Sequence, residues 1–419
     1  MRKRWWILGA MGAATGVLVV SGTLWWHSAA DLDAVAARAR AMGIPASFED
    51  IPNPEIADLA EVAALTAIEG LAEPLMAEWV FSEDAALDGD LYDRVGSQVG
   101  DPDPLVTMTM AHTGIAIRQL RAAVDALPDR PVRVGPTRDA VRMPRTWIGA
   151  GRSGVRSFQA WFRWGDDPAG DARRMTRIAE AMPHELLIDH LVIISMRAMV
   201  VGTVLGRWQE IPPGDPTVAR WQRWAEAPVL DLGIVAREIR VMIQTYRDRS
   251  PWELGDGGSS SSAWYMRLAG AQAVRRGRAG ALHAHLDLIT DLGATTAVMV
   301  RQSVIQSFDQ RARWSRSGWP QPLMDPLGWN LRMTAPALET ILRMEFRQQI
   351  QSALLVALIR GEPIPIDPTD PAGKPLRRYE RDGELIGYYA CGDDGVDDGG
   401  STDDWRFPFD RPWDPPAAP

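Results

Sequence analysis

An uncharged run near the N-terminus constrains this chain more than any other feature. The 22 residues from Trp5 to Trp26 contain no charged side chain. As a helix that rises 1.5 Å per residue, they would extend about 33 Å, enough to cross a hydrocarbon core of about 30 Å. A pair of tryptophans stands at each end of the run, and such rings favour the headgroup layer of a membrane. The run therefore predicts a transmembrane helix.

Charges around this run predict its orientation. Arg2, Lys3 and Arg4 precede it, and basic residues stay on the cytoplasmic side. We therefore expect a single-pass protein of a bacterial cytoplasmic membrane, with its N-terminus in the cytoplasm and its body in the periplasm. A cleaved signal peptide is the alternative, because Ser28-Ala29-Ala30 is a suitable cleavage site. Its apolar region would normally have only about 7–15 residues, so we favour an uncleaved anchor.

Composition limits the class of protein. With 46% hydrophobic and 24% charged residues among 419, the chain is typical of a folded protein of two or three domains. A net charge of −9 argues against a nucleic-acid binder, which needs a basic face. The single cysteine, Cys391, excludes an internal disulfide and a thiolate metal cage.

Most of the chain has helical signals. We expect an anchor at 1–30, a juxtamembrane helix and linker at 31–55, and an all-α domain at 56–360. Helices are expected near 103–127, 136–164, 168–182, 183–209, 231–248, 263–312 and 335–360, arranged as hairpins. The Ser- and Gly-rich stretch 250–262 is where this domain would divide. Pro336 is expected to begin the last helix, where Leu338, Leu342 and Phe346 recur every fourth residue.

Two stretches of the helical body have more specific patterns. A G-D-D-P turn from Gly165 to Pro168 joins two helical segments and resembles one tetratricopeptide-like pair, but no second copy follows at a 34-residue period. We therefore expect a single irregular hairpin. The segment from Pro183 to Trp208 is apolar nearly all round. Asp189, His190 and Arg197 would be costly in lipid, so a buried central helix is favoured over a second membrane span.

The amino-acid composition changes after residue 360. Residues 361–406 are rich in Gly, Pro and Asp, with short β-prone pieces at 376–379 and 384–389, and we expect a small β appendage there. Residues 407–419, rich in proline, are expected to form an extended tail. The fold class is thus mainly α, with an N-terminal transmembrane helix, an all-α body of helical hairpins and a small C-terminal β appendage.

Motifs that carry chemistry are weak in the helical body. The stretch from Gly149 to Gly154 matches G-x-G-x-x-G, but no βαβ alternation surrounds it, so we interpret it as a helix break. His184, Glu185 and His190 superficially suggest a zinc helix. Zinc proteases need histidines four residues apart, whereas these are six apart and face different directions.

Three further patterns have an ordinary structural explanation. His283, Asp287 and Asp291 share one helical face and could ligate a divalent ion, although a solvated polar face is commoner. His112 is expected at a core or boundary position. The scattered tryptophans could bind sugars, but on helices at this spacing they are more often packing residues.

The C-terminal region resembles a known family. Its D-P-A-G-K-P turn begins at Asp370, and a strand from Gly387 leads into the Gly-rich acidic loop that ends at Gly400. This arrangement is similar to the C-terminal β region of the major pseudopilin of type II secretion systems, in which that loop binds calcium. The resemblance covers about 45 residues. The prepilin-peptidase site and the early Glu of the family are missing, and about 300 helical residues intervene, so a pilus subunit is not expected.

The whole arrangement looks closer to a loose group of uncharacterised, membrane-anchored bacterial envelope proteins, for which no activity is established. The resemblance therefore implies location and architecture only. It also implies calcium ligands at Asp394, Asp403 and Asp404. Carboxylates packed into one turn repel one another unless they point apart or converge on a cation. The other acidic residues of this stretch are therefore candidates as well. The candidate Ca²⁺ ligands are Asp393, Asp394, Asp397, Asp398, Asp403 and Asp404.

Three functions follow as expectations. The favoured one is a non-enzymatic envelope protein, an anchored helical scaffold that binds a protein or peptide partner, with a role in secretion as one option. It is favoured because no catalytic constellation was found. An exported metal-dependent hydrolase using His184, Glu185 or His283 is one alternative, and a carbohydrate-binding module using clustered tryptophans is the other.

Overall fold

A computed structural model describes residues 33–44, 59–80, 102, 104–132, 146–182, 187–227, 286, 326–392, 394–401 and 404–409. The chain divides into two units. One comprises Met1–Pro54 and Asp231–Thr340, and the other comprises Glu55–Leu230 and Ile341–Pro419. The predicted anchor and the predicted helix 231–248 lie outside the described residues, as does helix 263–312 except for residue 286.

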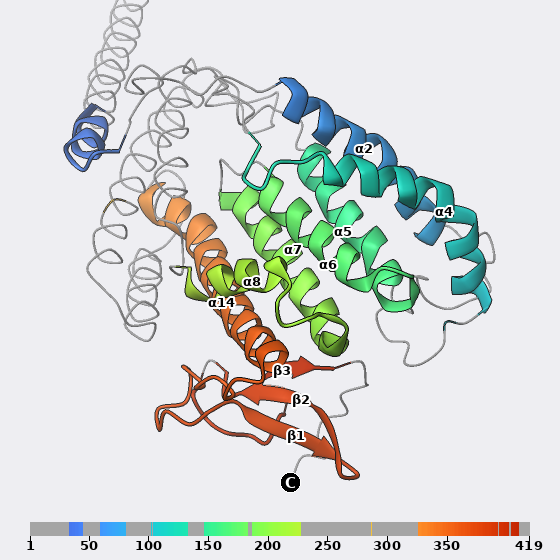
Figure 1. Ribbon diagram of the computed structural model, residues 1–419. Coiled ribbons are helices and arrows are strands. Elements are labelled where there is room, and N and C mark those ends of the chain that lie inside the picture. The colour runs from blue at the N-terminus through green and yellow to red at the C-terminus, as the bar shows by residue number, and fades with distance from the viewer. Residues whose placement is uncertain are drawn as a thin grey trace, which may run out of the picture. The chain divides into compact units, whose positions relative to one another are not determined.

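The described chain is mainly helical, with a small antiparallel sheet near the C-terminus, as the sequence predicted (Figure 1). A short helix covers residues 33–41. The labelled α-helices are α2 (Leu59–Val80), α4 (Pro104–Asp125), α5 (Thr146–Trp164), α6 (Pro168–Ala181), α7 (Leu187–Gly206), α8 (Pro216–Glu226) and α14 (Pro326–Arg360). The sequence analysis did not anticipate α2 or α8.

Four of these helices begin at a proline that follows an aspartate in the sequence. They are α4, α6, α8 and α14. Proline suits the first helical position because its fixed φ is already helical and its missing N–H would have no partner there. At α6 the carboxylate of Asp167 accepts the N–H of Gly170 at 3.0 Å, and at α8 that of Asp215 accepts the N–H of Thr217 at 2.8 Å. Each aspartate therefore caps its helix.

Helix α5 is central to the helical body and packs against α2, α6 and α7. The G-x-G-x-x-G stretch lies inside α5, so our interpretation of it as a helix break was wrong. Its glycines instead allow close packing. A Cβ at Gly154 would lie 3.1 Å from Cδ1 of Ile178, and one at Gly151 would lie 2.6 Å from Sδ of Met182. The helix stays intact because its neighbours compensate for the low helix propensity of glycine.

The apolar segment predicted at 183–209 forms α7, which contacts α5 and α6. Among the described residues, one helical stretch, Asp189–Gly206, is long and apolar enough to cross a membrane, and 50% of it is buried inside the protein. Its buried side chains include Ile194, Val200, Val201 and Val204. These contacts are those of a core helix, which passes the same test of length and composition.

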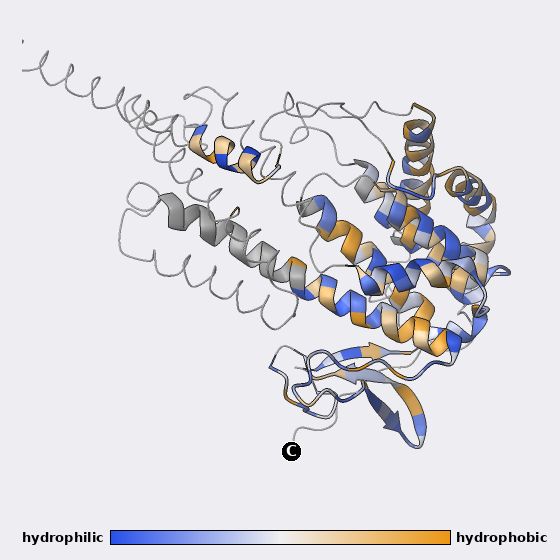
Figure 2. Ribbon diagram, turned by 60° about the vertical axis from the view of Figure 1, so that its left-hand side comes forward, coloured by the Kyte–Doolittle hydropathy of each residue, from blue (hydrophilic) through white to orange (hydrophobic). Residues whose placement is uncertain are grey.

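Helix α14 is longer than the sequence predicted. It begins at Pro326, and Pro336 lies in its interior, so the prediction that Pro336 begins the helix was wrong. An interior proline removes one backbone hydrogen bond, a loss that a helix of 35 residues tolerates. The C-terminal end of α14 is hydrophobic (Figure 2), and residues 361–376 connect it to the first strand of the sheet. Earlier in α14, the ring of Phe346 meets that of Trp405 edge to face, with centroids 5.6 Å apart.

The sheet has the order β1-β2-β3 and is antiparallel throughout. Its strands are β1 (Arg377–Arg381), β2 (Glu384–Ala390) and β3 (Trp405–Pro408). Asp382 and Gly383 form the β1–β2 turn with φ of 54° and 80°, as an Asp-Gly hairpin requires. The first two strands match the β-prone pieces of the sequence. The third extends into the expected tail, because Phe407 pairs with Tyr388 and is fully buried.

Candidate functional site

A charged surface pocket of about 380 Å³ lies between the end of α4, α6 and the first turn of α8. This volume is within the usual range for small-ligand pockets. We call it the arginine-lined pocket, because its charged lining consists of four guanidinium groups and two carboxylates. Its lining residues are Asp125, Asp129, Gly170, Arg173, Arg174, Arg177, Pro216, Thr217 and Arg220.

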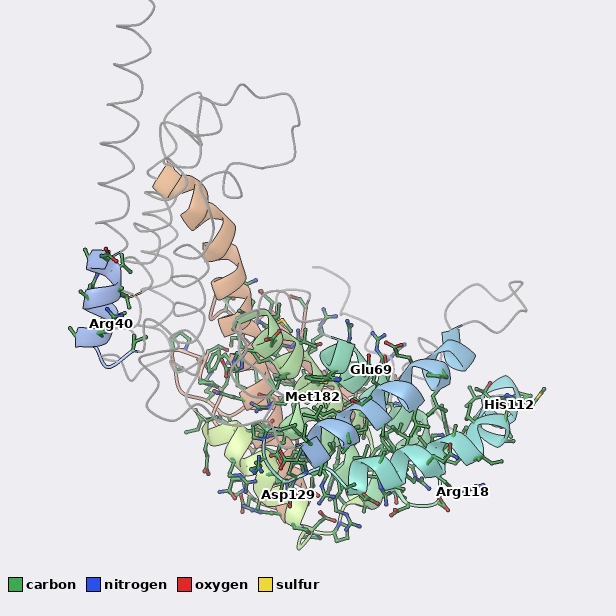
Figure 3. The ribbon with its side chains drawn as sticks, turned by 90° about the horizontal axis from the view of Figure 1, so that it is seen from above. Arg40, Glu69, His112, Arg118, Asp129 and Met182 are labelled. Carbon is green, nitrogen blue, oxygen red and sulfur yellow. The ribbon has the colours of Figure 1, made fainter. Side chains whose placement is uncertain are left out.

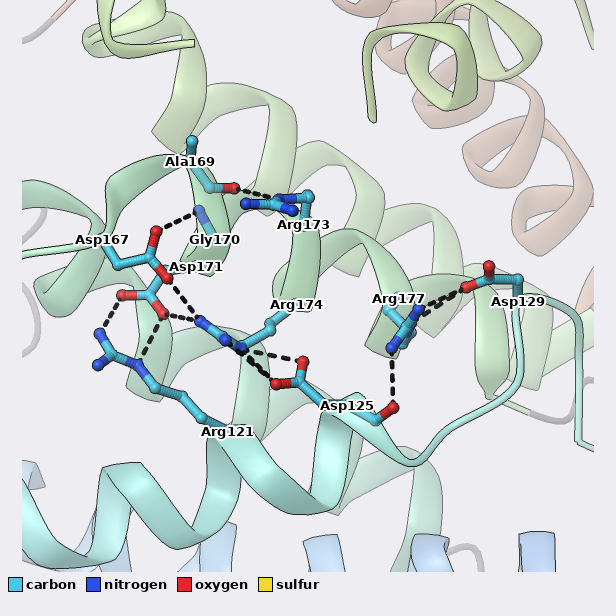
Figure 4. Close-up of polar contacts among 10 residues, drawn as sticks. All are labelled: Arg121, Asp125, Asp129, Asp167, Ala169, Gly170, Asp171, Arg173, Arg174 and Arg177. Atoms are coloured by element: carbon cyan, nitrogen blue, oxygen red, sulfur yellow. Dashed lines mark hydrogen bonds and ion pairs between the residues drawn. The ribbon is translucent and has the colours of Figure 1, made fainter. Parts of the chain in front are cut away.

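The spacing of charges along α6 places its arginines on this pocket. Arg173 and Arg177 are four residues apart, and Arg174 and Arg177 are three apart, so neighbouring turns present them on one side of the helix. Figure 4 shows Arg174 and Arg177 reaching toward the end of α4 and the loop after it. In that loop lies Asp129, which Figure 3 labels near α8.

A buried carboxylate connects α4 to α6. Asp171 is fully buried. Its Oδ1 accepts a hydrogen bond from Nε of Arg121 at 2.9 Å, and its Oδ2 accepts one from Nη2 of the same arginine at 2.7 Å. Nη1 of Arg174 donates to Oδ1 of Asp171 at 3.2 Å and to Oδ2 of Asp167 at 3.1 Å. Burial raises the pKa of Asp171, and the hydrogen bonds from Arg121 and Arg174 oppose that rise. The contact between Asp171 and Arg121 therefore holds α6 against α4.

Asp129 connects α6 to α8 across the pocket. Its Oδ1 accepts Nε of Arg177 at 3.0 Å and lies 2.6 Å from Nη2 of Arg220. The hydrogen bond from Arg220 is the main cause that lowers the pKa of Asp129. Nη1 of Arg220 also donates to Oε2 of Glu180 at 2.8 Å. One carboxylate thus receives hydrogen bonds from two helices.

Tryptophans of α8 complete the contact with α6. Trp221 is fully buried, and its Nε1 donates to Oγ1 of Thr176 at 3.0 Å. Trp224 is 4% exposed, and its Nε1 donates to Oε1 of Glu180 at 3.2 Å. Buried rings whose N–H groups have partners are packing residues, as expected from their helical spacing, and they are not available to stack on a sugar.

In the C-terminal sheet, one arginine is surrounded by acidic residues. Arg377 of β1 places Nη1 at 3.0 Å from Asp367, Nη2 at 2.6 Å from Asp370 and Nε at 2.5 Å from Asp397. Asp367 is fully buried and also accepts the N–H of Cys391 at 2.9 Å. A guanidinium has five N–H donors in a fixed fork, so Arg377 connects three segments of this region.

The structure describes four of the six candidate calcium ligands and separates their roles. Asp397 accepts a hydrogen bond from Arg377 and another from the hydroxyl of Tyr389, the latter at 3.1 Å. Asp394 accepts the N–H of Val396 at 3.0 Å in a local turn, and Asp398 is exposed. Asp393 and Asp403 lie outside the described residues. In the described part of the chain, no three His, Cys, Asp or Glu side chains converge on one metal position.

The fourth candidate, Asp404, is different because it is buried. It is 5% exposed, and its Oδ2 accepts the N–H groups of Gly400 and Ser401 at 2.7 and 3.2 Å. Its Oδ1 is also buried but has no hydrogen-bond partner within the described residues. Burial raises the pKa of Asp404. A buried carboxylate oxygen without a partner is costly, and a cation would remove that cost.

Of the residues considered for a catalytic metal site, His184, Glu185 and His283 lie outside the described residues, and His190 is described. His190 is 4% exposed, with Nε2 at 3.4 Å from Oε1 of the buried Glu345. Burial raises the pKa of Cys391 to about 12, so this thiol remains protonated at neutral pH. His112 is exposed on α4, so its prediction as a core or boundary residue was wrong (Figure 3).

Comparison of the chain with protein-family models, with curated proteins and with solved structures finds no match.

The sequence analysis missed the arginine-lined pocket. Two signals were available: the three arginines within five residues of α6, and the two Asp-Pro helix starts at Pro168 and Pro216. Neither could identify a pocket, because its carboxylates come from the end of α4 and from the loop after it, 49 residues before Arg174 and 48 before Arg177.

Proposed function

We propose that this chain is a non-enzymatic, membrane-anchored protein of the cell envelope, whose helical body binds a partner protein or peptide. The observation that carries the proposal is the arginine-lined pocket. It opens at the surface, and three helices and their ion pairs hold its walls. Rigid walls reduce the ordering cost of binding, so this is the part of the described body best suited to recognise a ligand.

Chemistry at the pocket favours binding over catalysis. Its charged side chains are arginines and aspartates. Guanidinium groups remain charged at all physiological pH values and cannot act as bases. The carboxylates Asp125 and Asp129 already accept hydrogen bonds from arginines, so they are poorly placed to take a proton from a substrate.

Partner binding can be tested in the full chain in native membranes. A photo-crosslinking residue would replace Ala219, which is exposed on α8 one turn after Pro216. The same residue at Arg378, exposed on β1, is the control. We expect an adduct with one defined protein at position 219 only, and saturable binding of that purified protein. Identical adducts at both positions, or none at 219, would contradict the proposal.

The membrane location depends on the uncharged N-terminal run and is tested separately. A reporter that is active only in the periplasm, fused after Arg360, should be active because the basic flank of Arg2, Lys3 and Arg4 keeps the N-terminus in the cytoplasm. Replacing these three residues with Glu should reduce that activity. Activity of a cytoplasmic reporter alone at the same position would show that the location is wrong.

We also propose that the C-terminal region binds Ca²⁺, with Asp404 as a ligand. Support comes from the buried Oδ1 of Asp404, which has no hydrogen-bond partner in the described residues, and from the neighbouring acidic loop. Calcium accepts 6–8 oxygen ligands in flexible geometry, and extracellular modules bind it with Kd of about 10⁻⁴–10⁻³ M. Such an affinity would suffice outside the cytoplasm.

Calorimetry on the full chain tests calcium binding. We expect saturable binding of Ca²⁺ at millimolar concentration or below. Asp404→Asn and Asp394→Ala should each weaken it, whereas Asp382→Asn, on an exposed turn of the same sheet, should not. The proposal fails if there is no saturation below about 10 mM, well above the expected Kd, or if Asp404→Asn leaves the affinity unchanged.

A further inference from the structure

The charges of the arginine-lined pocket are balanced within its own walls. Each of its four arginines lies within ion-pair distance of a carboxylate. The pairs are Arg173 with Asp215, Arg174 with Asp125, and both Arg177 and Arg220 with Asp129. An anionic ligand would meet these aspartates, and a cationic ligand would meet the arginines. The pocket therefore has no net charge with which to select a charged ligand.

Two side chains at the pocket keep hydrogen-bonding capacity that their ion pairs do not use. Nε of Arg173 donates to the carbonyl of Ala169 at 3.4 Å, and within the described residues its two terminal nitrogens make no hydrogen bond (Figure 4). Oδ1 of Asp129 accepts hydrogen bonds from Arg177 and Arg220, whereas its Oδ2 accepts none in the described part of the chain. The side chains of Arg173 and Asp129 are 53% and 56% exposed. The pocket thus offers open donors and an open acceptor.

We propose that the arginine-lined pocket binds an uncharged, amide-rich peptide segment, whose carboxamide oxygens accept hydrogen bonds from Arg173 and whose N–H groups donate to Asp129. This inference rests on the proposed function and specifies the chemistry of its partner. The carboxamide of Asn or Gln has an oxygen that accepts, an NH₂ group that donates, and no charge. It therefore matches a pocket with open donors, an open acceptor and balanced charge.

Hydrogen-bonding capacity separates a carboxamide from its charged counterparts. An ionised carboxylate only accepts hydrogen bonds, and an ammonium group only donates them. A carboxylate could bind Arg173, but it would also face the like charge of Asp129. An ammonium group could bind Asp129, but it would face the like charge of Arg173. A neutral segment with both donors and acceptors meets neither cost.

Calorimetry on the detergent-solubilised full chain tests this inference with three capped peptides: tetraglutamine, tetraglutamate and tetralysine. Gln and Glu differ only in the group that replaces one carboxylate oxygen, so the first two peptides are matched in shape. We expect saturable binding of tetraglutamine with a Kd below about 1 mM, and binding of both charged peptides that is weaker by about tenfold or more. Because the ligand is neutral, its affinity should change by less than about twofold between about 50 and 500 mM NaCl.

Variants of the open donor test which group receives the peptide. Arg173→Ala should weaken tetraglutamine binding by about tenfold, the loss typical of a hydrogen bond to a charged group. Arg173→Lys, which keeps a charged donor, should recover part of that affinity. The control is Arg378→Ala on β1, where the side chain is 62% exposed, and it should bind as the wild type does. Equal melting temperatures of the two alanine variants would show that the lost affinity is not a loss of folding.

Three results would overturn the inference. They are no saturable tetraglutamine binding below about 1 mM, binding of either charged peptide that is as tight or tighter, and equal affinity in Arg173→Ala. Competition separates this inference from the proposed function. If the adduct at position 219 forms but saturating tetraglutamine does not reduce it, the partner binds without these amide contacts and the inference fails. If the peptide binds but no adduct forms, the proposed partner-binding function is the part that fails.

Discussion

At the scale of single residues, Asp171 has a large predicted effect on stability. It is fully buried between Arg121 and Arg174. Asp171→Asn would remove the charge that both guanidinium groups face. Breaking a buried ion pair from one side costs about 3–5 kcal/mol, because it leaves the partner charge without compensation. Since the two arginines keep some contact with solvent, we expect about 3 kcal/mol, measured by urea unfolding.

A matched control is available on the same arginine. Asp166 lies 3.5 Å from Nη1 of Arg121, but its side chain is 83% exposed. An exposed pair contributes little, so Asp166→Asn should cost no more than about 0.5 kcal/mol. Equal losses in the two variants would mean that burial does not determine the strength of this network.

Arg377 gives a prediction that depends on pH. The N–H of Ala372 and then Arg377 lower the pKa of Asp370. Burial opposes the shift at Asp397, but the N–H of Gly399 and Arg377 lower its pKa below the ordinary value of 3.8. A lowered folded-state pKa contributes stability above the ordinary value, and this contribution is lost as the pH falls through the folded pKa.

Arg377→Gln should therefore destabilise the chain at pH 7 and have less effect in acid. At pH 7 it leaves the buried carboxylate of Asp367 without its charged partner, at a cost of about 3 kcal/mol. The difference from wild type should shrink as the pH falls from 3.8 through the lower folded-state pKa values of Asp370 and Asp397, because protonation of these carboxylates removes their attraction to Arg377. Urea unfolding between pH 7 and pH 2 measures this, with the exposed Arg378→Gln as control. A difference that is constant over this range would contradict the prediction.

At the scale of elements, the glycines of α5 determine how closely the helices pack. A Cβ at Gly154 would lie 3.1 Å from Ile178, with Ile68 and Ala72 just beyond. Gly154→Leu should therefore overpack the core at a cost of about 2 kcal/mol. Gly149 lies on the same helix with nothing within 4 Å of its Cβ position, so Gly149→Ala should stabilise by about 0.5–1 kcal/mol.

Thermal unfolding of the two glycine variants would test this packing. We expect Gly154→Leu to lower the melting temperature and Gly149→Ala to leave it unchanged or raise it. If both variants lower it equally, the close approach of α5 to α6 is not what requires glycine at position 154.

At the scale of the whole molecule, the unit of Glu55–Leu230 and Ile341–Pro419 is interrupted by the other unit. Its two pieces meet where Nε2 of Gln349 donates to the carbonyl of Ala227 at 2.8 Å. Residue 341 lies eight helical residues before Gln349, or about 12 Å. A flexible linker of ten residues spans about 17 Å, so it can replace residues 231–340.

We therefore expect a chain of residues 55–230 and 341–419, joined by a ten-residue Gly/Ser linker, to unfold cooperatively. Circular dichroism during heating measures this. As a control, further removal of α8 should abolish cooperative unfolding, because it takes away the buried Trp221 and Trp224. Gradual melting of the linked chain itself would show that the unit depends on residues 1–54 or 231–340.

The sequence by itself determined the elements whose signals are local. An aspartate followed by proline begins α6, which was predicted near 168–182, because the cap and the first helical φ are set within a few residues. The β-prone pieces at 376–379 and 384–389 predicted β1 and β2 for the same reason. Proline and glycine did not mark helix boundaries where packing against neighbours stabilises the helix, as at Pro336 inside α14 and at the glycines inside α5.

Only the tertiary structure decided which charges meet. The sequence shows an excess of arginines, but Arg121 finds Asp171 50 residues away, and Arg177 finds Asp129 48 residues away. It also placed Arg377, rather than solvent, beside three aspartates of the C-terminal region. Helical periodicity indicates which face of a helix a charge occupies. Which partner lies opposite depends on how the helices pack, and burial then determines how strongly the two charges interact.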